Sequence, residues 1–244
     1  MLVADNSLLV PFKGKHEGQS AIVFGTGSSL EQFSWSLLPE TPDISAGVNF
    51  IIFRDDIKLD YYFAAHYICD SSAPPVHYAD KIVERSRPKM RPDGFLIPRK
   101  GMQVFIGAAP YARHVEFPLA DVARMHNAIV FELTNKSGEI NFSHDLVSMP
   151  FYNHSIIFSP MQLLLYAGVK KIYLVGCDCG GKYSCIDVKD GTQEIHSERE
   201  FDYHVGFVDY WKEFLPFKLK HYPDVEIISV NPGGLAGMFT DLYL

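Results

Sequence analysis

The sequence has little that would suit a membrane, a nucleic acid or an exported disulfide scaffold. Its 22 lysines and arginines are outnumbered by 29 acidic residues, and the net charge of -7 argues against broad nucleic-acid binding. No apolar run is long enough to span a bilayer, since the stretch at 156–169 is interrupted by Ser159, Pro160 and Gln162. The first ten residues lack the basic start of a signal peptide, so we expect a cytoplasmic chain whose four cysteines are reduced.

Metal-binding patterns are also missing. The sequence contains no Asp-x-Asp, the carboxylate pair by which many glycosyltransferases hold a metal ion on a donor diphosphate. Cys177, Cys179 and Cys185 have a C-x-C-x5-C spacing that matches none of the common zinc patterns. We therefore predict no metal site.

What the sequence does contain is an alternation of short apolar strands with helices. Buried-strand patterns occur at 21–24, 44–53, 61–67, 102–108, 128–133, 171–178 and 225–230. Helical patterns occur at 30–38, 73–87, 155–168 and 201–219. Because 244 residues suit one large domain, we predict a single α/β domain over 1–244. Its sheet should be Rossmann-like, mainly parallel and flanked by helices, with a mobile lid loop at about 180–204.

The first predicted strand is followed by a glycine turn, Gly25-Thr26-Gly27-Ser28-Ser29. Two glycines allow a sharp bend and the close approach of a ligand, and Ser28 or Ser29 can cap the helix expected next. Amide hydrogens at such a corner attract phosphate. Leu30 replaces the third glycine of the dinucleotide-binding pattern, and the turn lacks the Lys-Ser/Thr pair of a P-loop. A tight turn with no ligand is therefore the alternative.

Two further residues end predicted strands on the side of the sheet where ligands of open α/β folds bind. Asn49 could bond a ribose, base or phosphate oxygen, or it could pin a local turn. Asp178 could bind a ribose or sugar hydroxyl, or cap the next loop. For proton transfer near neutral pH an imidazole is suited, and His204 follows the predicted lid. The alternative for His204 is a surface histidine on an aromatic helix.

The order of four segments resembles a known family. These are Lys13-Gly14-Lys15, the stretch from Ala21 to Leu30, Gly47-Val48-Asn49, and the stretch from Ala167 to Asp178. The layout resembles the bacterial DUF115 family, whose domain is also called 6-hydroxymethylpterin diphosphokinase MptE-like. It is also similar to the family 42 bacterial sialyltransferases and to flagellin-modifying Maf proteins. The resemblance implies a Rossmann-like domain that binds a nucleotide or nucleotide-sugar, and the occurrence of members in surface-polysaccharide gene sets favours glycosyl transfer.

The resemblance also implies binding roles for particular residues. Thr26 stands where the sialyltransferases have an Asn near the donor phosphates. Asn49 matches their second-strand Asn, and His66 falls near their third-strand Asn. Ser155 falls near the Ser or Thr that starts their long helix, and Asp178 is the Asp that closes the KIYLVGCD-type strand.

For catalysis, the resemblance places the sialyltransferase histidine nearest to His204, with His196 as the second choice. Their two lid tyrosines are not clearly retained, although Tyr183 and Tyr203 are available. This gap leaves the donor open.

Three functions follow as hypotheses. The first is a glycosyltransferase that takes a sugar, with sialic-acid-like sugars as one candidate, from a nucleotide donor to a glycan acceptor and needs no cofactor. The second is an MptE-like pyrophosphokinase that transfers from ATP to a pterin-like alcohol and would need Mg²⁺. The third is a non-catalytic nucleotide-binding domain. A homo-oligomer is compatible with each of them.

Overall fold

Short runs of β-branched and aromatic residues form the strands of one central sheet, because such side chains pack well on a pleated surface that is buried on both faces. The computed structural model describes residues 5–48, 51, 54, 56–66, 101–108, 128–134, 142–149, 151–152, 155–179, 185–189, 192–196 and 207–244. The predicted helix at 73–87 lies outside these residues, as do Asn49 and His204.

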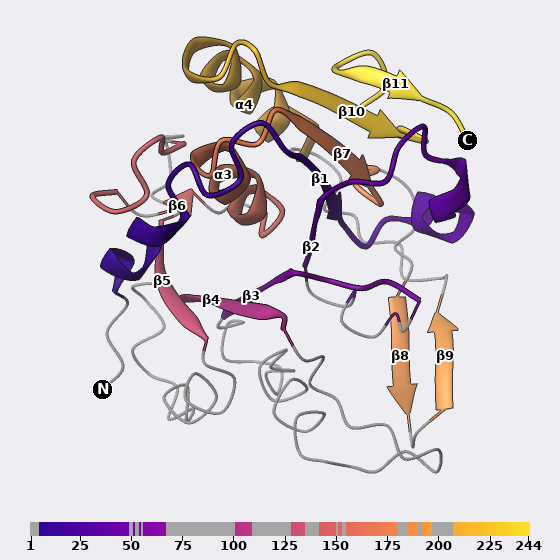
Figure 1. Ribbon diagram of the computed structural model, residues 1–244. Coiled ribbons are helices and arrows are strands. Elements are labelled where there is room, and N and C mark those ends of the chain that lie inside the picture. The colour runs from indigo at the N-terminus through magenta and orange to yellow at the C-terminus, as the bar shows by residue number, and fades with distance from the viewer. Residues whose placement is uncertain are drawn as a thin grey trace.

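Within the described residues the main sheet has nine strands, and every neighbouring pair is parallel. The strands are β1 (Ser20–Phe24), β2 (Ile44–Val48), β3 (Tyr61–His66), β4 (Gln103–Ala108), β5 (Ile129–Thr134), β6 (Phe151–Tyr152), β7 (Lys171–Val175), β10 (Glu226–Val230) and β11 (Thr240–Leu242). Their spatial order is β11-β10-β7-β1-β2-β3-β4-β5-β6 (Figure 1). The predicted α/β, Rossmann-like sheet is confirmed.

The order of the strands reverses beside β1. From β1 the chain adds β2 to β6 one after another toward one edge, then returns to place β7 on the other side of β1. In the register of this central pair, Ser20 lies opposite Lys171 and Phe24 opposite Val175. Because the connections leaving β1 and β7 run in opposite directions, this pair is a topological switch point. In open α/β sheets, ligands bind beyond the carboxyl ends of the strands at such a point.

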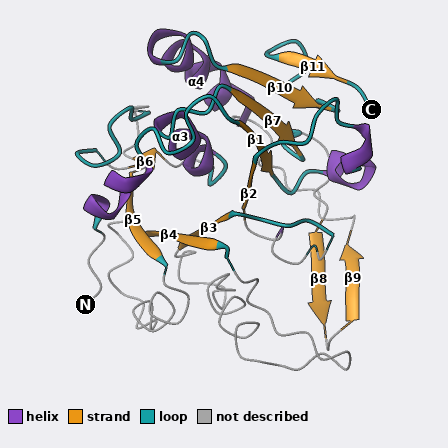
Figure 2. Ribbon diagram, viewed as in Figure 1, coloured by secondary structure: helices purple, strands orange, loops and turns teal. Residues whose placement is uncertain are grey.

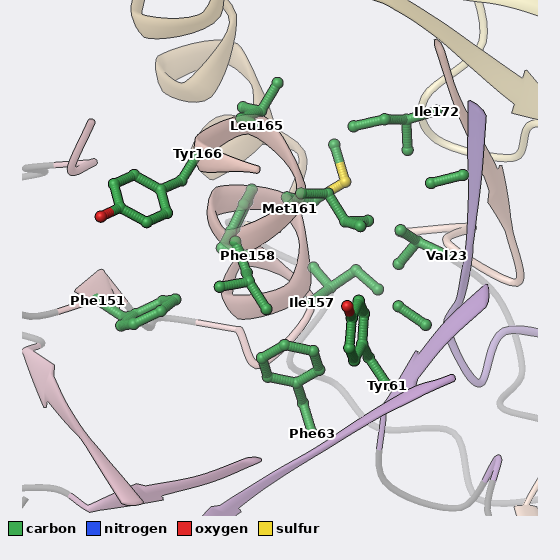
Figure 3. Packing of buried hydrophobic residues seen from close by; sticks show 14 of the residues in the cluster. Val23, Tyr61, Phe63, Phe151, Ile157, Phe158, Met161, Leu165, Tyr166 and Ile172 are labelled. Atoms are coloured by element: carbon green, nitrogen blue, oxygen red, sulfur yellow. The ribbon is translucent and has the colours of Figure 1, made fainter. Parts of the chain in front are cut away.

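Two helices cover one face of the sheet. They are α3 (Phe158–Tyr166), all of whose residues are buried, and α4 (Phe207–His221). Alternate strand residues such as Val23, Phe63 and Ile172 point toward α3, where Met161 and the N-cap residue Ile157 meet them (Figure 3). Gly168, with φ of +85°, follows α3 and ends it as predicted.

On the other face of the sheet, the described part of the chain contains no α-helix. Strand residues of the opposite parity, including Phe24, Tyr62 and Tyr173, pack there with Leu30 and Ile57. The segment after the glycine turn forms two short 3-10 helices, η2 (Ser28–Gln32) and η3 (Trp35–Leu37), and a third, η1 (Asn6–Phe12), lies near the N-terminus (Figure 2).

The helix predicted at 30–38 is therefore wrong. Phe33 and Trp35 both pack edge-on against Phe24, with ring centroids 5.3 and 5.6 Å away. A continuous helix would place these two side chains about 200° apart around its axis, so they could not both reach one ring. Ser34 and Ser36 further disfavour a helix here, because serine hydroxyls compete with the backbone for hydrogen bonds.

The segment predicted to be a lid loop contains two antiparallel strands, β8 (Cys185–Lys189) and β9 (Thr192–His196), which form a separate two-stranded sheet (Figure 1). The rest of that segment, with the start of the helix predicted from residue 201, lies outside the described residues. In the part of the chain that the structure describes, no helix combines the length and the apolar character needed to cross a bilayer.

Candidate functional site

The glycine turn lies against the end of β7 at the switch point. Gly25 N donates to Val175 O (2.8 Å), and Gly27 N donates to Gly176 O (2.7 Å). A Cβ atom on Gly27 would lie 2.6 Å from Cγ of Asp178 and 2.8 Å from Gly176 O, and one on Gly25 would collide with Gly176 O. Both glycines are therefore required by the close approach of β7.

Asp178 joins the end of β7 to the glycine turn through its side chain. The residue is only 7% exposed. Its Oδ2 accepts from Ser29 N (2.8 Å) and from Ser28 Oγ (3.2 Å), while Ser29 Oγ donates to Oδ1. An acidic side chain in contact only with donors acts as an ionised carboxylate, which accepts at both oxygens. Asp178 thus caps the turn that follows β1, whereas the sequence suggested a cap on the loop that follows Asp178 itself.

The loop that follows β10 completes this corner. Gly234 N donates to the main-chain oxygen of Asp178 (2.6 Å), and a Cβ on Gly233 would lie 2.8 Å from the same oxygen. Asp178 therefore joins three strand ends. It lies just after β7, its side chain binds the turn that follows β1, and its carbonyl oxygen binds the loop that follows β10.

Two amides of the turn have no hydrogen-bond partner within the described part of the chain. Leu30 N donates to Gly27 O within the turn, and Ser29 N is taken by Asp178. Among the residues that the structure describes, no acceptor is within hydrogen-bonding distance of Thr26 N or Ser28 N. Both residues are partly exposed. The partly exposed Thr26 and Ser28 thus lie at the corner where the topology predicts a ligand.

With this geometry in view, the chain can be compared with known proteins. No family model matches the sequence, and no curated protein matches it. A solved structure does match, that of a Maf glycosyltransferase from Magnetospirillum magneticum AMB-1. The fold is Maf-like. The match has a TM-score of 0.50 and covers 100% of this chain and 39% of the Maf protein, so the chain spans about two fifths of that protein's length. At 12% sequence identity the likeness is one of fold alone.

The remaining predicted binding residues follow other elements of the sheet. Asn49 lies outside the described residues, but it directly follows β2, the neighbour of β1. His66 ends β3, one strand further along, where its backbone lies opposite Ala108. Ser155 lies in the turn before α3, and its carbonyl oxygen accepts from Phe158 N (3.1 Å). Since α3 connects two parallel strands, it begins on the carboxyl side of the sheet, as the glycine turn does.

The remaining candidates are the catalytic histidines and the phosphate-binding lid tyrosines. His204, Tyr183 and Tyr203 lie outside the described residues, and His196 ends β9 in the separate hairpin. The structure thus brings together Asp178 and the turn from Gly25 to Ser29, and the assignment of a catalytic base remains a prediction.

The cysteines at the corner are half-buried. Burial raises the pKa of Cys177 well above its ordinary value, and the nearby Cys179 and Asp178 add to the effect. Burial likewise raises the pKa of Cys179 to about 12. Neutral thiols are poor nucleophiles and poor metal ligands. In the described parts of the chain, no group of three or more His, Cys, Asp or Glu side chains is arranged to hold a metal ion.

One polar residue near the corner was missed from the sequence. Asn231 directly follows β10, adopts φ of +47°, and accepts from Leu244 N at Oδ1 (2.8 Å). Its Nδ2 is buried and has no hydrogen-bond partner among the described residues. The signal was available, because Asn231 follows its strand as Asn49 follows β2, at the same edge of a parallel sheet.

Proposed function

We propose that the chain is a glycosyltransferase that moves a sugar from a nucleotide-activated donor to a glycan acceptor, in surface glycan biosynthesis. The observation that carries the proposal is the glycine turn at the switch point, where Thr26 and Ser28 are partly exposed. The Maf-like fold supports it, since the protein with that fold is a glycosyltransferase. A CMP-linked sugar of the sialic acid type is the donor class that we propose to test first.

In this proposal the donor phosphate is bound by the amides of Thr26 and Ser28. Asn49, His66 and Ser155 hold the nucleoside or the sugar from the neighbouring carboxyl ends. Asp178 acts indirectly, because its carboxylate is already engaged by the serines of the turn. His204 takes the proton of the acceptor hydroxyl, or protonates the leaving phosphate, while the segment at 180–204 closes over the donor.

The first experiment measures thermal stability with CMP, UDP, GDP and ATP, each at millimolar concentration, with and without Mg²⁺. We expect at least one nucleotide to raise the melting temperature, because a ligand that binds only the folded state stabilises it. No shift with any nucleotide would refute the proposal. A pyrophosphokinase would give a different result. ATP would stabilise the protein only with Mg²⁺, and AMP would be released when a pterin alcohol is present.

The second experiment tests the amide of Ser28 directly. Ser28 is the first residue of η2, where proline is well tolerated, and Gly27 before it is extended (φ -71°, ψ 161°), as a residue before proline should be. Ser28→Pro therefore removes one amide hydrogen while preserving the backbone path. We expect nucleotide affinity to fall by about tenfold, since a hydrogen bond to a charged group contributes roughly 1.5–3 kcal/mol.

Ser28→Ala is the matched control, because it removes the same hydroxyl but keeps the amide. It should bind nucleotide nearly as the wild type does. If the alanine and proline variants bind equally, the phosphate does not lie at this amide. Turnover is then followed by CMP release from a CMP-sugar with an acceptor glycan, and His204→Ala should abolish it. Binding without turnover in the wild type would indicate a non-catalytic domain.

A further inference from the structure

The candidate site contains a fixed negative charge. The carboxylate of Asp178 is buried and receives three hydrogen bonds from neutral donors of the turn. No lysine, arginine or histidine in the described part of the chain forms an ion pair with it. The hydrogen bonds hold the carboxylate in place without cancelling its charge.

This charge lies within the turn that the proposed function assigns to the donor phosphate. Oδ2 of Asp178 lies 3.2 Å from Ser28 Oγ and 2.8 Å from the amide nitrogen of Ser29, the residue that follows Ser28. A phosphate oxygen that accepted from Ser28 N would lie within about 9 Å of the carboxylate, given ordinary hydrogen-bond lengths. At that separation and an effective dielectric constant near 20, each added negative charge lowers affinity by at least about tenfold.

We propose that Asp178 determines the charge of the phosphate group that the turn accepts. Its carboxylate favours a singly charged phosphodiester, as in a nucleoside monophosphate joined to a sugar, over a doubly charged phosphate or a diphosphate. The hydrogen bonds that position Ser28 and Ser29 also hold the Asp178 carboxylate in place, and its negative charge discriminates between singly and doubly charged phosphate groups. This inference rests on the proposed function, because it concerns the same ligand site.

The first test removes the charge and keeps the shape. Calorimetric titrations in EDTA compare three proteins, namely the wild type, Asp178→Asn and Asp43→Asn. Each is titrated with cytidine, CMP and CDP, and in parallel with uridine, UMP and UDP. Asp43 is a matched control, because it accepts from Ser20 N and Ser20 Oγ (both 2.9 Å) at the amino end of β1. We expect the affinity for the diphosphate relative to the monophosphate to rise about tenfold in Asp178→Asn and to stay constant in Asp43→Asn.

A folded Asp178→Asn whose ratio stays within twofold of the wild type would overturn the inference and leave the proposed function intact. If the wild type binds no nucleotide of either series, both fall. A large loss of all binding by Asp178→Asn, with an unchanged ratio, would show a positioning role alone and would also overturn the inference.

The second test needs no variant, so it holds even if Asp178→Asn fails to fold. UMP gains a proton near pH 6, whereas its methyl ester keeps one negative charge throughout. On lowering the pH from 7.5 to 5.5, UMP should bind several-fold more tightly and the methyl ester should not. On η2, in the segment 176–179 after β7 and in the loop 231–239, the described titratable groups besides Asp178 are Glu31, Cys177 and Cys179. An equal change for both ligands would mean that protein groups titrate, which contradicts the inference.

Discussion

At the scale of residues, a single arrangement recurs at three strand ends. Asp43 accepts from the amide and hydroxyl of Ser20, Asp60 accepts from those of Ser45, and Asp178 accepts from those of Ser29. Each carboxylate satisfies a serine amide that the sheet leaves without a partner, which would be costly if buried. The first two lie at the amino ends of β1 and β2. Only Asp178 lies at the carboxyl ends, where its charge can meet a ligand.

The close packing of the glycine turn makes a prediction about stability. Gly27→Ala should destabilise the protein by about 1–3 kcal/mol, because the new methyl group would overlap the Asp178 carboxyl group and Gly176 O. Gly237→Ala is the control. No heavy atom lies within 4 Å of its Cβ position, and its φ of +75° should cost only about 1 kcal/mol. Urea unfolding measures both, and an equal loss would show that the turn yields without strain.

Burial of the two cysteines predicts how they react. Because the thiol pKa of Cys179 is raised to about 12 and that of Cys177 also lies well above its ordinary value, very little thiolate is present at pH 8. We expect iodoacetamide to modify neither residue in the native protein and both in urea, as measured by peptide mass spectrometry. Rapid native modification of Cys177 would show that the corner opens.

At the scale of elements, β1 to β5, β7 and β10 were predictable because each is a short apolar run. The residues at Ala21–Phe24 and Ile172–Val175 are buried on both faces of the sheet. Such strands are unbroken apolar runs, so they can be identified without an alternating pattern. β11 was not predictable, since its three residues Thr240, Asp241 and Leu242 are exposed or half-buried and carry no strand pattern. The error after the glycine turn came from aromatic packing on Phe24, which depends on the tertiary fold.

The site was predictable in part. Strand-end rules placed the glycine turn and Asp178 at one edge of the sheet. They did not reveal that the Asp178 carboxylate occupies Ser29 N, because that contact depends on the register of β1 against β7, whose sequences lie far apart. The roles of Asn49 and His204 stay predictions.

The contact between α4 and the loop at 142–149 predicts a dependence on pH. The rings of His144 and His221 stack with centroids 4.5 Å apart. Burial, and then the charges of His144 and Lys220, lower the pKa of His221 below its ordinary 6.5. The unfolded state therefore takes up the proton first, and stability should fall as the pH drops below about 6.5.

Urea unfolding at pH 8 and pH 5.5 checks this. Wild-type protein should lose stability relative to His221→Gln on acidification, and His144→Asn should recover part of the loss by removing the neighbouring charge. A stability difference between wild type and His221→Gln that does not change with pH would contradict the prediction.

At the scale of the whole molecule, the sheet predicts where the fold is most persistent. β1 and β7 have neighbours on both sides and are covered on both faces, whereas β11 has one described neighbour and half-exposed side chains. Hydrogen exchange followed by mass spectrometry should therefore find the slowest amides in peptides covering 20–24 and 171–175, and much faster exchange at 240–242. Equal protection of all three would mean that the sheet opens only as one unit.

The reversal of strand order also shapes how the chain is made. A ribosome releases β1 about 150 residues before β7, which at usual speeds of 5–20 residues per second is a delay of roughly ten to thirty seconds. During that time one side of β1 has no neighbour, and the loop that Asp178 will later fasten is unrestrained. A nascent chain stalled before residue 170 should therefore depend on chaperones, and its nucleotide-binding corner can form only after β7 has emerged.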